Sequence, residues 1–139
     1  MSQRPFKILG IEHVGIAVND LNGVSDTFGD LLGMELRIRE KIADQQVMTD
    51  IYKTGNSKLE FLKATDPDSP IARFIDKKGE GIHHIALIVD NLQSALDYLS
   101  QQSVQLIDNK PRIGAEGLSI AFIHPKSTGG ILIELCEKK

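Results

Sequence analysis

A strand-like stretch of apolar and polar positions occurs twice along this chain. Residues 8–18 alternate like a β-strand with one buried face, and residues 82–89 form a second, mostly apolar strand. In the first segment one side holds branched apolar residues. The other side holds His13 beside two small residues, Gly15 and Ala17. A small-residue face that carries one imidazole suits the wall of a cavity.

Helical spacing follows each of these strands. Asp20 is a suitable N-cap for a helix that ends at Gly33, with one apolar face formed by Leu21, Val24, Phe28, Leu31 and Leu32. A second helix is expected from about residue 92 to 102. Three extended segments then follow in each half. They are residues 34–41, 47–54 and 58–63 in the first half, and residues 104–107, 118–124 and 131–137 in the second. Each half therefore has the order strand, helix and three strands.

A short helix is predicted between the halves. Ser69 can cap it, Pro70 suits its first position, and Gly79 follows its last residues. The sequence thus predicts an α+β fold in a single domain. This domain consists of two βαβββ modules, about residues 8–63 and 81–137, joined by a short helical linker.

The two halves align on residues that can bind a metal. Residues 10–21 align with residues 81–92 without a gap, which places His13 opposite His84 at an offset of 84 − 13 = 71. The last strands of the halves align on Glu60 and Glu134, at an offset of 134 − 60 = 74. Each half therefore supplies one histidine from its first strand and one glutamate from its last.

This set of four side chains favours a metal site. A carboxylate inside an apolar strand costs free energy unless it is paired or binds a cation. Two imidazoles and two carboxylates suit zinc, cobalt, nickel, manganese or iron(II). Any one of the four could be a core histidine or a glutamate paired with lysine. Because all four recur in register within a duplication, we favour the metal.

Composition narrows the class of protein. The 139 residues include 41% hydrophobic and 25% charged side chains, and the net charge of −3 argues against a nucleic-acid binder. The single cysteine, Cys136, excludes an internal disulfide and fits a reducing compartment. No apolar run reaches the length of a membrane span, and the first residues lack a signal peptide's apolar core. We therefore expect a cytoplasmic protein that does not enter membranes.

Several segments resemble the vicinal oxygen chelate superfamily (glyoxalase, bleomycin resistance and dioxygenase proteins), and within it the methylmalonyl-CoA epimerases. The segments are residues 13–18, 58–62, 68–72, 81–85, 113–117 and 124–135. The resemblance implies that paired βαβββ modules form a curved, mostly antiparallel sheet around a metal. It implies that the metal ligands are His13, Glu60, His84 and Glu134, with one divalent ion (cobalt, manganese, nickel or zinc) per chain. It also implies a homodimer.

The resemblance further implies an activity, which is the interconversion of (2R)- and (2S)-methylmalonyl-CoA through a metal-stabilised enolate. Such an epimerase needs an acid/base group on each face of the enolate. Glu134 matches one of these groups. The family's second glutamate has no match in this chain. Thr49 or Asp50 stands in the closest register, and Asp50 is the candidate.

Two other functions are compatible with the same residues. A glyoxalase I-type lactoylglutathione lyase uses a similar ligand set, and the segments 69–77 and 124–135 favour the epimerase over it. A non-catalytic small-molecule binding or resistance protein on the same fold would not need four metal-binding side chains. An extradiol dioxygenase would need two histidines and a single carboxylate.

Overall fold

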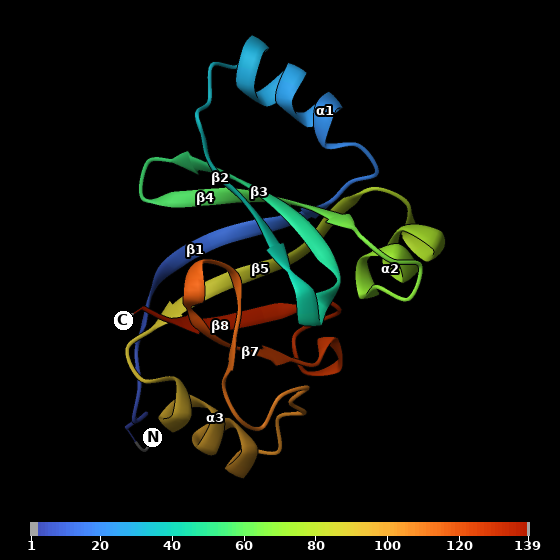
Figure 1. Ribbon diagram of the computed structural model, residues 1–139. Helices are drawn as coiled ribbons and strands as arrows, with labels where there is room; N and C mark the ends of the chain where they lie inside the picture. Colours follow the sequence, from blue (N-terminus) through green and yellow to red (C-terminus); the bar gives the residue numbers. More distant parts are fainter. Residues whose placement is uncertain (1–2, 139) are drawn as a thin grey trace. The chain divides into compact units, whose positions relative to one another are not determined.

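A computed structural model describes residues 3–138 of the chain. The chain divides into two compact units. The first unit is His13–His83, and the second unit comprises the residues up to Glu12 together with those from His84 onward. Both units carry the predicted order of one strand, one helical segment and three strands (Figure 1).

The elements of the first half lie close to their predicted positions. They are β1 (Ile8–Ala17), α1 (Leu21–Val24), a π-helical turn (Ser25–Leu31), β2 (Leu36–Ile42), a 3₁₀ turn (Ala43–Gln45), β3 (Val47–Thr54), β4 (Ser57–Ala64) and α2 (Pro70–Lys78). The Asp20 carboxylate accepts a hydrogen bond from the backbone N–H of Asn22, so it caps α1 as predicted. The Ser69 hydroxyl likewise accepts a hydrogen bond from the N–H of Ile71 and caps α2.

The second half repeats this order. Its elements are β5 (Gly81–Val89), α3 (Leu92–Gln101), β6 (Arg112–Ile113), a 3₁₀ turn (Ala115–Gly117), β7 (Ser119–Ile123), a second 3₁₀ turn (Pro125–Ser127) and β8 (Ile133–Glu137). The tandem βαβββ architecture predicted from the sequence is confirmed.

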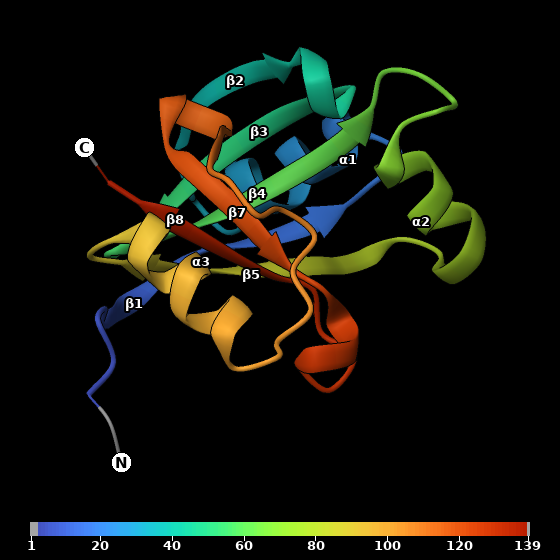
Figure 2. The ribbon, with the colours of Figure 1, turned by 90° about the horizontal axis from the view of Figure 1, so that it is seen from below.

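In the first unit, β4 pairs in parallel with residues 13–17 of β1 and antiparallel with β3, and β3 pairs antiparallel with β2 (Figure 2). One face of these strands packs under α1 and the π-helical turn. The core of this face consists of Leu21, Val24, Tyr52 and Phe61, with Ile16, Met48 and Leu59 against it. The opposite face carries the side chains that alternate with these, and it is the face that holds His13 and Glu60.

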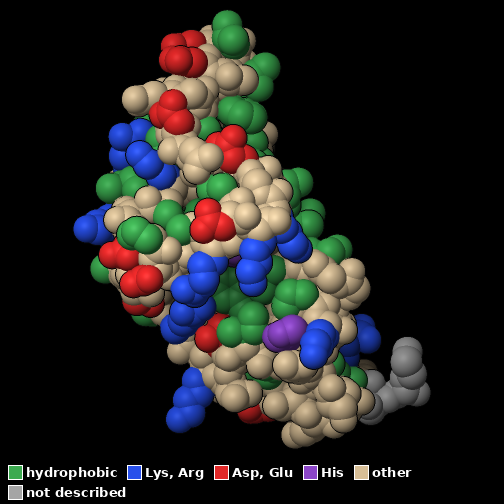
Figure 3. Space-filling model, turned by 90° about the vertical axis from the view of Figure 1, so that its right-hand side faces the viewer, with side chains coloured by type: hydrophobic (Ala, Val, Ile, Leu, Met, Phe, Trp, Pro, Cys, Tyr) green, Lys and Arg blue, Asp and Glu red, His purple; other side chains and the backbone are tan. Residues whose placement is uncertain are grey.

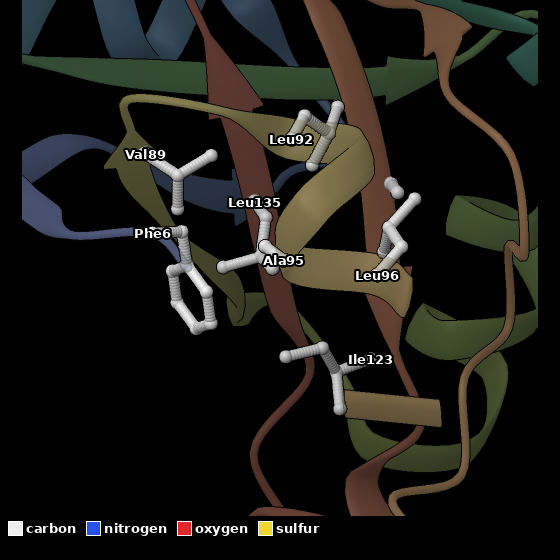
Figure 4. Close-up of a cluster of buried hydrophobic side chains, with 8 residues drawn as sticks. Phe6, Val89, Leu92, Ala95, Leu96, Ile123 and Leu135 are labelled. Atoms are coloured by element: carbon white, nitrogen blue, oxygen red, sulfur yellow. The ribbon is translucent and has the colours of Figure 1, made fainter. Parts of the chain in front are cut away.

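In the second unit, β8 pairs in parallel with β5 and antiparallel with β7, and β7 pairs antiparallel with β6. Helix α3 covers one face and directs Leu92, Ala95 and Leu96 toward Ile123 and Leu135 (Figure 4). A second cluster lies on the other face and consists of Ala86, Ile120, Phe122 and Cys136. As in the first unit, the residues with metal-binding groups belong to the face that does not carry the helix.

Two local predictions need correction. Residues 104–107 are not a strand, because only Leu106 forms an isolated bridge, to Ile123. The edge strand of this half is Arg112–Ile113 instead. The first helix also continues as a π-helical turn, which shifts the phase of its side chains. As a result Leu31, expected on the buried face, has an exposed fraction of 81%.

Basic and acidic side chains both occur on the face drawn in Figure 3. Among residues 3–138, no helix combines the length and the apolar character needed to cross a membrane.

Candidate metal and catalytic site

The first unit brings His13 and Glu60 together. Glu60 on β4 lies opposite Gly15 in the parallel pairing with β1, two residues beyond His13 and on the same face. The Nδ1 atom of His13 is 3.1 Å from Oε2 of Glu60, and both side chains are buried. Gly15, which has no side chain, and Ala17 follow His13 on the same face of β1.

The second unit repeats the arrangement with His84 and Glu134. The Nε2 atom of His84 is 3.3 Å from Oε1 of Glu134, and both residues are again buried. The rings of His84 and Phe122 form a T-shaped contact, with their centroids 5.7 Å apart. Phe122 also lies directly opposite Glu134 in the antiparallel pairing.

The register of the two units is identical around these pairs. Glu60 pairs with Gly15 and Glu134 pairs with Ala86, so each glutamate stands opposite the residue two places after the histidine. The additional three residues in the second half therefore lie between the histidine strand and the glutamate strand, and do not disturb the pair. The internal repeat inferred from the sequence is thus a repeat of strand register, while the nitrogen nearest the glutamate is Nδ1 in His13 and Nε2 in His84.

The separation between imidazole nitrogen and carboxylate oxygen fits two ligands of one ion. With metal–ligand bonds of about 2.1 Å, neighbouring ligand atoms are about 3.0 Å apart in octahedral geometry and about 3.4 Å apart in tetrahedral geometry. The observed separations of 3.1 Å and 3.3 Å lie in this range. Buried imidazole and carboxylate also form a donor set suited to a divalent ion. Each pair could therefore hold a divalent metal.

Asp50, the predicted second acid/base residue, has a different environment. Both of its oxygens accept hydrogen bonds from the guanidinium group of Arg39, at 2.6 Å and 2.8 Å. These bonds and the carboxylate charge raise the pKa of Arg39. In the strand register Asp50 lies opposite Phe61, so its side chain belongs to the helix-covered face and not to the face of Glu60. Its role in proton transfer stays a prediction.

Two polar residues share the face of Glu60: Thr49, which the sequence gave as the alternative to Asp50, and Glu40, which the sequence did not single out. Thr49 lies opposite Leu62, two residues beyond Glu60 on β4, and Glu40 on β2 lies opposite Thr49. Thr49 is wholly buried and Glu40 is half-buried. Apolar residues occupy both faces of β3, so its alternation did not indicate which polar side chains face the site.

His83, which precedes His84, packs against the linker helix. Its ring meets the ring of Phe74 edge-on at 5.0 Å. Burial, and secondarily the charge of Lys78, lower the pKa of His83 to about 4. These contacts are those of a structural histidine, as its position beside His84 on the strand predicts.

Comparisons with known proteins agree with this geometry. Residues 12–122 match the sequence profile of the Glyoxalase/Bleomycin resistance protein/Dioxygenase superfamily. The mitochondrial methylmalonyl-CoA epimerase of Homo sapiens is 36% identical over 126 residues, which cover 90% of this chain and 72% of that protein. The crystal structure of methylmalonyl-CoA epimerase from Mycobacterium tuberculosis superposes with a TM-score of 0.90 at 36% identity, over 95% of this chain and 89% of the other.

A second solved structure contains a ligand. It is a methylmalonyl-CoA epimerase in complex with methylmalonyl-CoA and NH4+, with a TM-score of 0.91, 30% identity and coverage of 95% of this chain and 96% of the other. The identity, the coverage and the shared fold lead to one assignment. The chain belongs to the glyoxalase/bleomycin resistance/dioxygenase superfamily, in the group that includes the methylmalonyl-CoA epimerases.

Proposed function

We propose that this protein is a metal-dependent epimerase that interconverts (2R)- and (2S)-methylmalonyl-CoA. The observation that carries the proposal is the repeated buried His–Glu pair, in identical register in both units. Relatives and structural neighbours named as methylmalonyl-CoA epimerases cover nearly the whole chain, which supports this substrate over a glutathione hemithioacetal.

All four residues, His13, Glu60, His84 and Glu134, would hold one divalent ion, which is cobalt, manganese, nickel or zinc in this proposal. Support comes from the internal duplication and from the family, because one chain contains a complete set of two imidazoles and two carboxylates. The bound ion would supply positive charge where negative charge develops on the substrate's oxygen atoms.

The protein side chains would move the protons. Glu134 would take the α-proton on one face of the substrate, and an acid on the opposite face would deliver a proton to the same carbon. The two groups exchange roles when the reaction runs in reverse. For the second group, Asp50 is the candidate from the sequence and Glu40 is the candidate from the strand register.

We also propose that the enzyme acts as a homodimer in the cytoplasm. The dimer rests on the family resemblance. The compartment rests on the single cysteine, Cys136, which is buried and forms no disulfide. Sedimentation velocity of the purified protein and fractionation of cells that express it test these two points.

Proton NMR in D2O tests the activity. The cobalt-loaded protein is incubated with (2S)-methylmalonyl-CoA, and in parallel with methylglyoxal and glutathione. We expect loss of the α-proton signal and of chirality, and we expect Glu134→Gln to abolish both while the protein stays folded. Turnover of the hemithioacetal without α-proton exchange would transfer the assignment to a glyoxalase I-type lyase. Inactivity in both assays would favour a non-catalytic binding protein.

A further inference from the structure

Thr49 on β3 is a buried polar residue whose hydroxyl satisfies no structural need. Its exposed fraction is 0%, and its Oγ1 atom has no hydrogen-bond partner among the described residues. Buried hydroxyl groups in folded proteins are almost always hydrogen-bonded, because an unpaired one keeps the full cost of losing its water. An exception of this kind requires an explanation.

The strand register places this hydroxyl beside the metal-binding pair of the first unit. Thr49 lies opposite Leu62, and the neighbouring position on β4 and the same face is Glu60. Such diagonal neighbours have Cβ atoms about 7–8 Å apart or somewhat less. On the other side of β4, Ala17 of β1 lies opposite Leu62, and its methyl group takes little space. A small molecule bound at Glu60 therefore comes within reach of Thr49.

The internal repeat shows that the fold does not require a hydroxyl at this position. In the second unit, Ile120 lies opposite Cys136, which is two residues beyond Glu134 on β8. In the first unit, Thr49 lies opposite Leu62, which is two residues beyond Glu60 on β4. Ile120 is buried in an apolar cluster. A branched apolar side chain is therefore sufficient for packing at the equivalent place, and the hydroxyl of Thr49 is an addition specific to the first unit.

We propose that Thr49 is a substrate-positioning residue whose hydroxyl donates a hydrogen bond to the carboxylate of the bound acyl group. This inference rests on the proposed function. If the thioester oxygen and one carboxylate oxygen of a malonyl-type thioester occupy the metal, the second carboxylate oxygen is the one acyl oxygen left for another donor. A hydrogen bond from Thr49 to this charged oxygen would fix the rotation of the carboxylate and select acyl groups that carry one.

The test compares two ligands and four forms of the metal-loaded protein. The ligands are malonyl-CoA, which carries the carboxylate but has no stereocentre to epimerise, and propionyl-CoA, which lacks the carboxylate. The proteins are the wild type, Thr49→Val, Thr49→Ser and Thr54→Val. Thr54→Val is the matched control, because it is the same chemical change at an exposed position on the same strand. Calorimetry gives the dissociation constants, and thermal unfolding and metal content are measured in parallel.

We expect Thr49→Val to raise the Kd of malonyl-CoA about ten- to a hundredfold and that of propionyl-CoA less than twofold, the loss expected for a hydrogen bond to a charged group. Its melting temperature should stay the same or rise, because an unpaired buried hydroxyl is removed, and its metal content should not change. Thr49→Ser should restore most of the malonyl-CoA affinity, and Thr54→Val should match the wild type.

Four results would overturn the inference. Unchanged malonyl-CoA affinity in Thr49→Val would show that the hydroxyl does not reach the ligand. Equal weakening of both ligands, or a lower melting temperature with loss of metal, would show that Thr49 only supports packing. A wild-type protein that binds neither ligand and exchanges no α-proton would remove the proposed function, and the role of Thr49 with it. This outcome is distinct because it appears before any substitution is made.

Discussion

The ion pair between Asp50 and Arg39 provides a test that separates a structural carboxylate from a catalytic one. Asp50 is wholly buried, whereas the side chain of Arg39 has an exposed fraction of 47%. Arg39→Met therefore leaves a buried carboxylate without its partner, whereas Asp50→Asn leaves a guanidinium that water can still reach. We expect the arginine substitution to be the more damaging, with a loss of about 3 kcal/mol in the free energy of unfolding, against about 2 kcal/mol for Asp50→Asn.

These losses convert into melting temperatures. At about 2.1 cal/mol/K per residue, a chain of 139 residues has an unfolding entropy of about 0.29 kcal/mol/K. Arg39→Met should then lower the melting temperature by about 10 °C and Asp50→Asn by about 7 °C. The double variant should lose less than the sum of the two, because the second substitution removes a group that the first left without a partner.

The assays are thermal unfolding by circular dichroism and α-proton exchange by NMR, both on metal-loaded protein. Because Asp50 lies on the helix-covered face, we expect Asp50→Asn to keep α-proton exchange within about tenfold of the wild type, well short of the loss caused by removing an acid/base group. Loss of exchange by a hundredfold or more at an unchanged melting temperature would refute this reasoning. It would instead support the catalytic role that the sequence predicts for Asp50.

Three further predictions concern Glu40, His13 and His83. If Glu40 is the second acid/base group, Glu40→Gln should reduce α-proton exchange at least a hundredfold at an unchanged melting temperature. Glu35→Gln is an exposed control and should keep the wild-type rate. Equal rates in the two variants would exclude Glu40. His13→Ala should lower the metal content after dialysis from about one ion per chain toward zero, whereas His124→Ala should retain it; full metal content in His13→Ala would exclude His13 as a ligand. The pKa of His83 falls from 6.5 to about 4 on folding, so the folded protein favours the neutral imidazole. The free energy of unfolding should therefore be highest above pH 6.5 and should decrease by up to about 3 kcal/mol as the pH falls toward 4. Urea unfolding from pH 7 to pH 4 should show this slope in the wild type and lose it in His83→Asn, and equal slopes in both would contradict the assignment.

The sequence predicted the parts of the fold in which one periodicity dominates. The strand that carries His13 and the linker helix from Pro70 have clear alternation or clear capping, and they form where expected. The π-helical turn was not predicted, because apolar spacing alone cannot separate it from an α-helix. Leu31 is therefore exposed, although its spacing predicted the buried face.

The sequence predicted the part of the candidate site that lies within the internal repeat. Duplication supplies two aligned copies, so the histidines and glutamates could be paired by their positions in the sequence. No such comparison was available for β3, where Tyr52 is buried and Met48 half-buried on one face, and Thr49 and Ile51 are buried on the other. With both faces apolar, alternation gave no direction for Asp50, and only the strand register shows which face it occupies.

The differences between the two units carry information that the similarities do not. A buried His–Glu pair occurs in both units, in the same strand register. The units differ at the next position along the neighbouring strands. The first unit carries Thr49 with Glu40 opposite, and the second carries Ile120 with Arg112 opposite. The guanidinium of Arg112 lies 5.4 Å from the centre of the ring of Phe122, on the face that carries Glu134. An epimerase must bind a substrate whose two ends differ, a thioester at one end and a carboxylate at the other. A symmetric set of ligands cannot distinguish these ends. Under the proposed function, the polar residues beside the pair in each unit can, and variants of these residues should change the choice of acyl group without loss of metal binding.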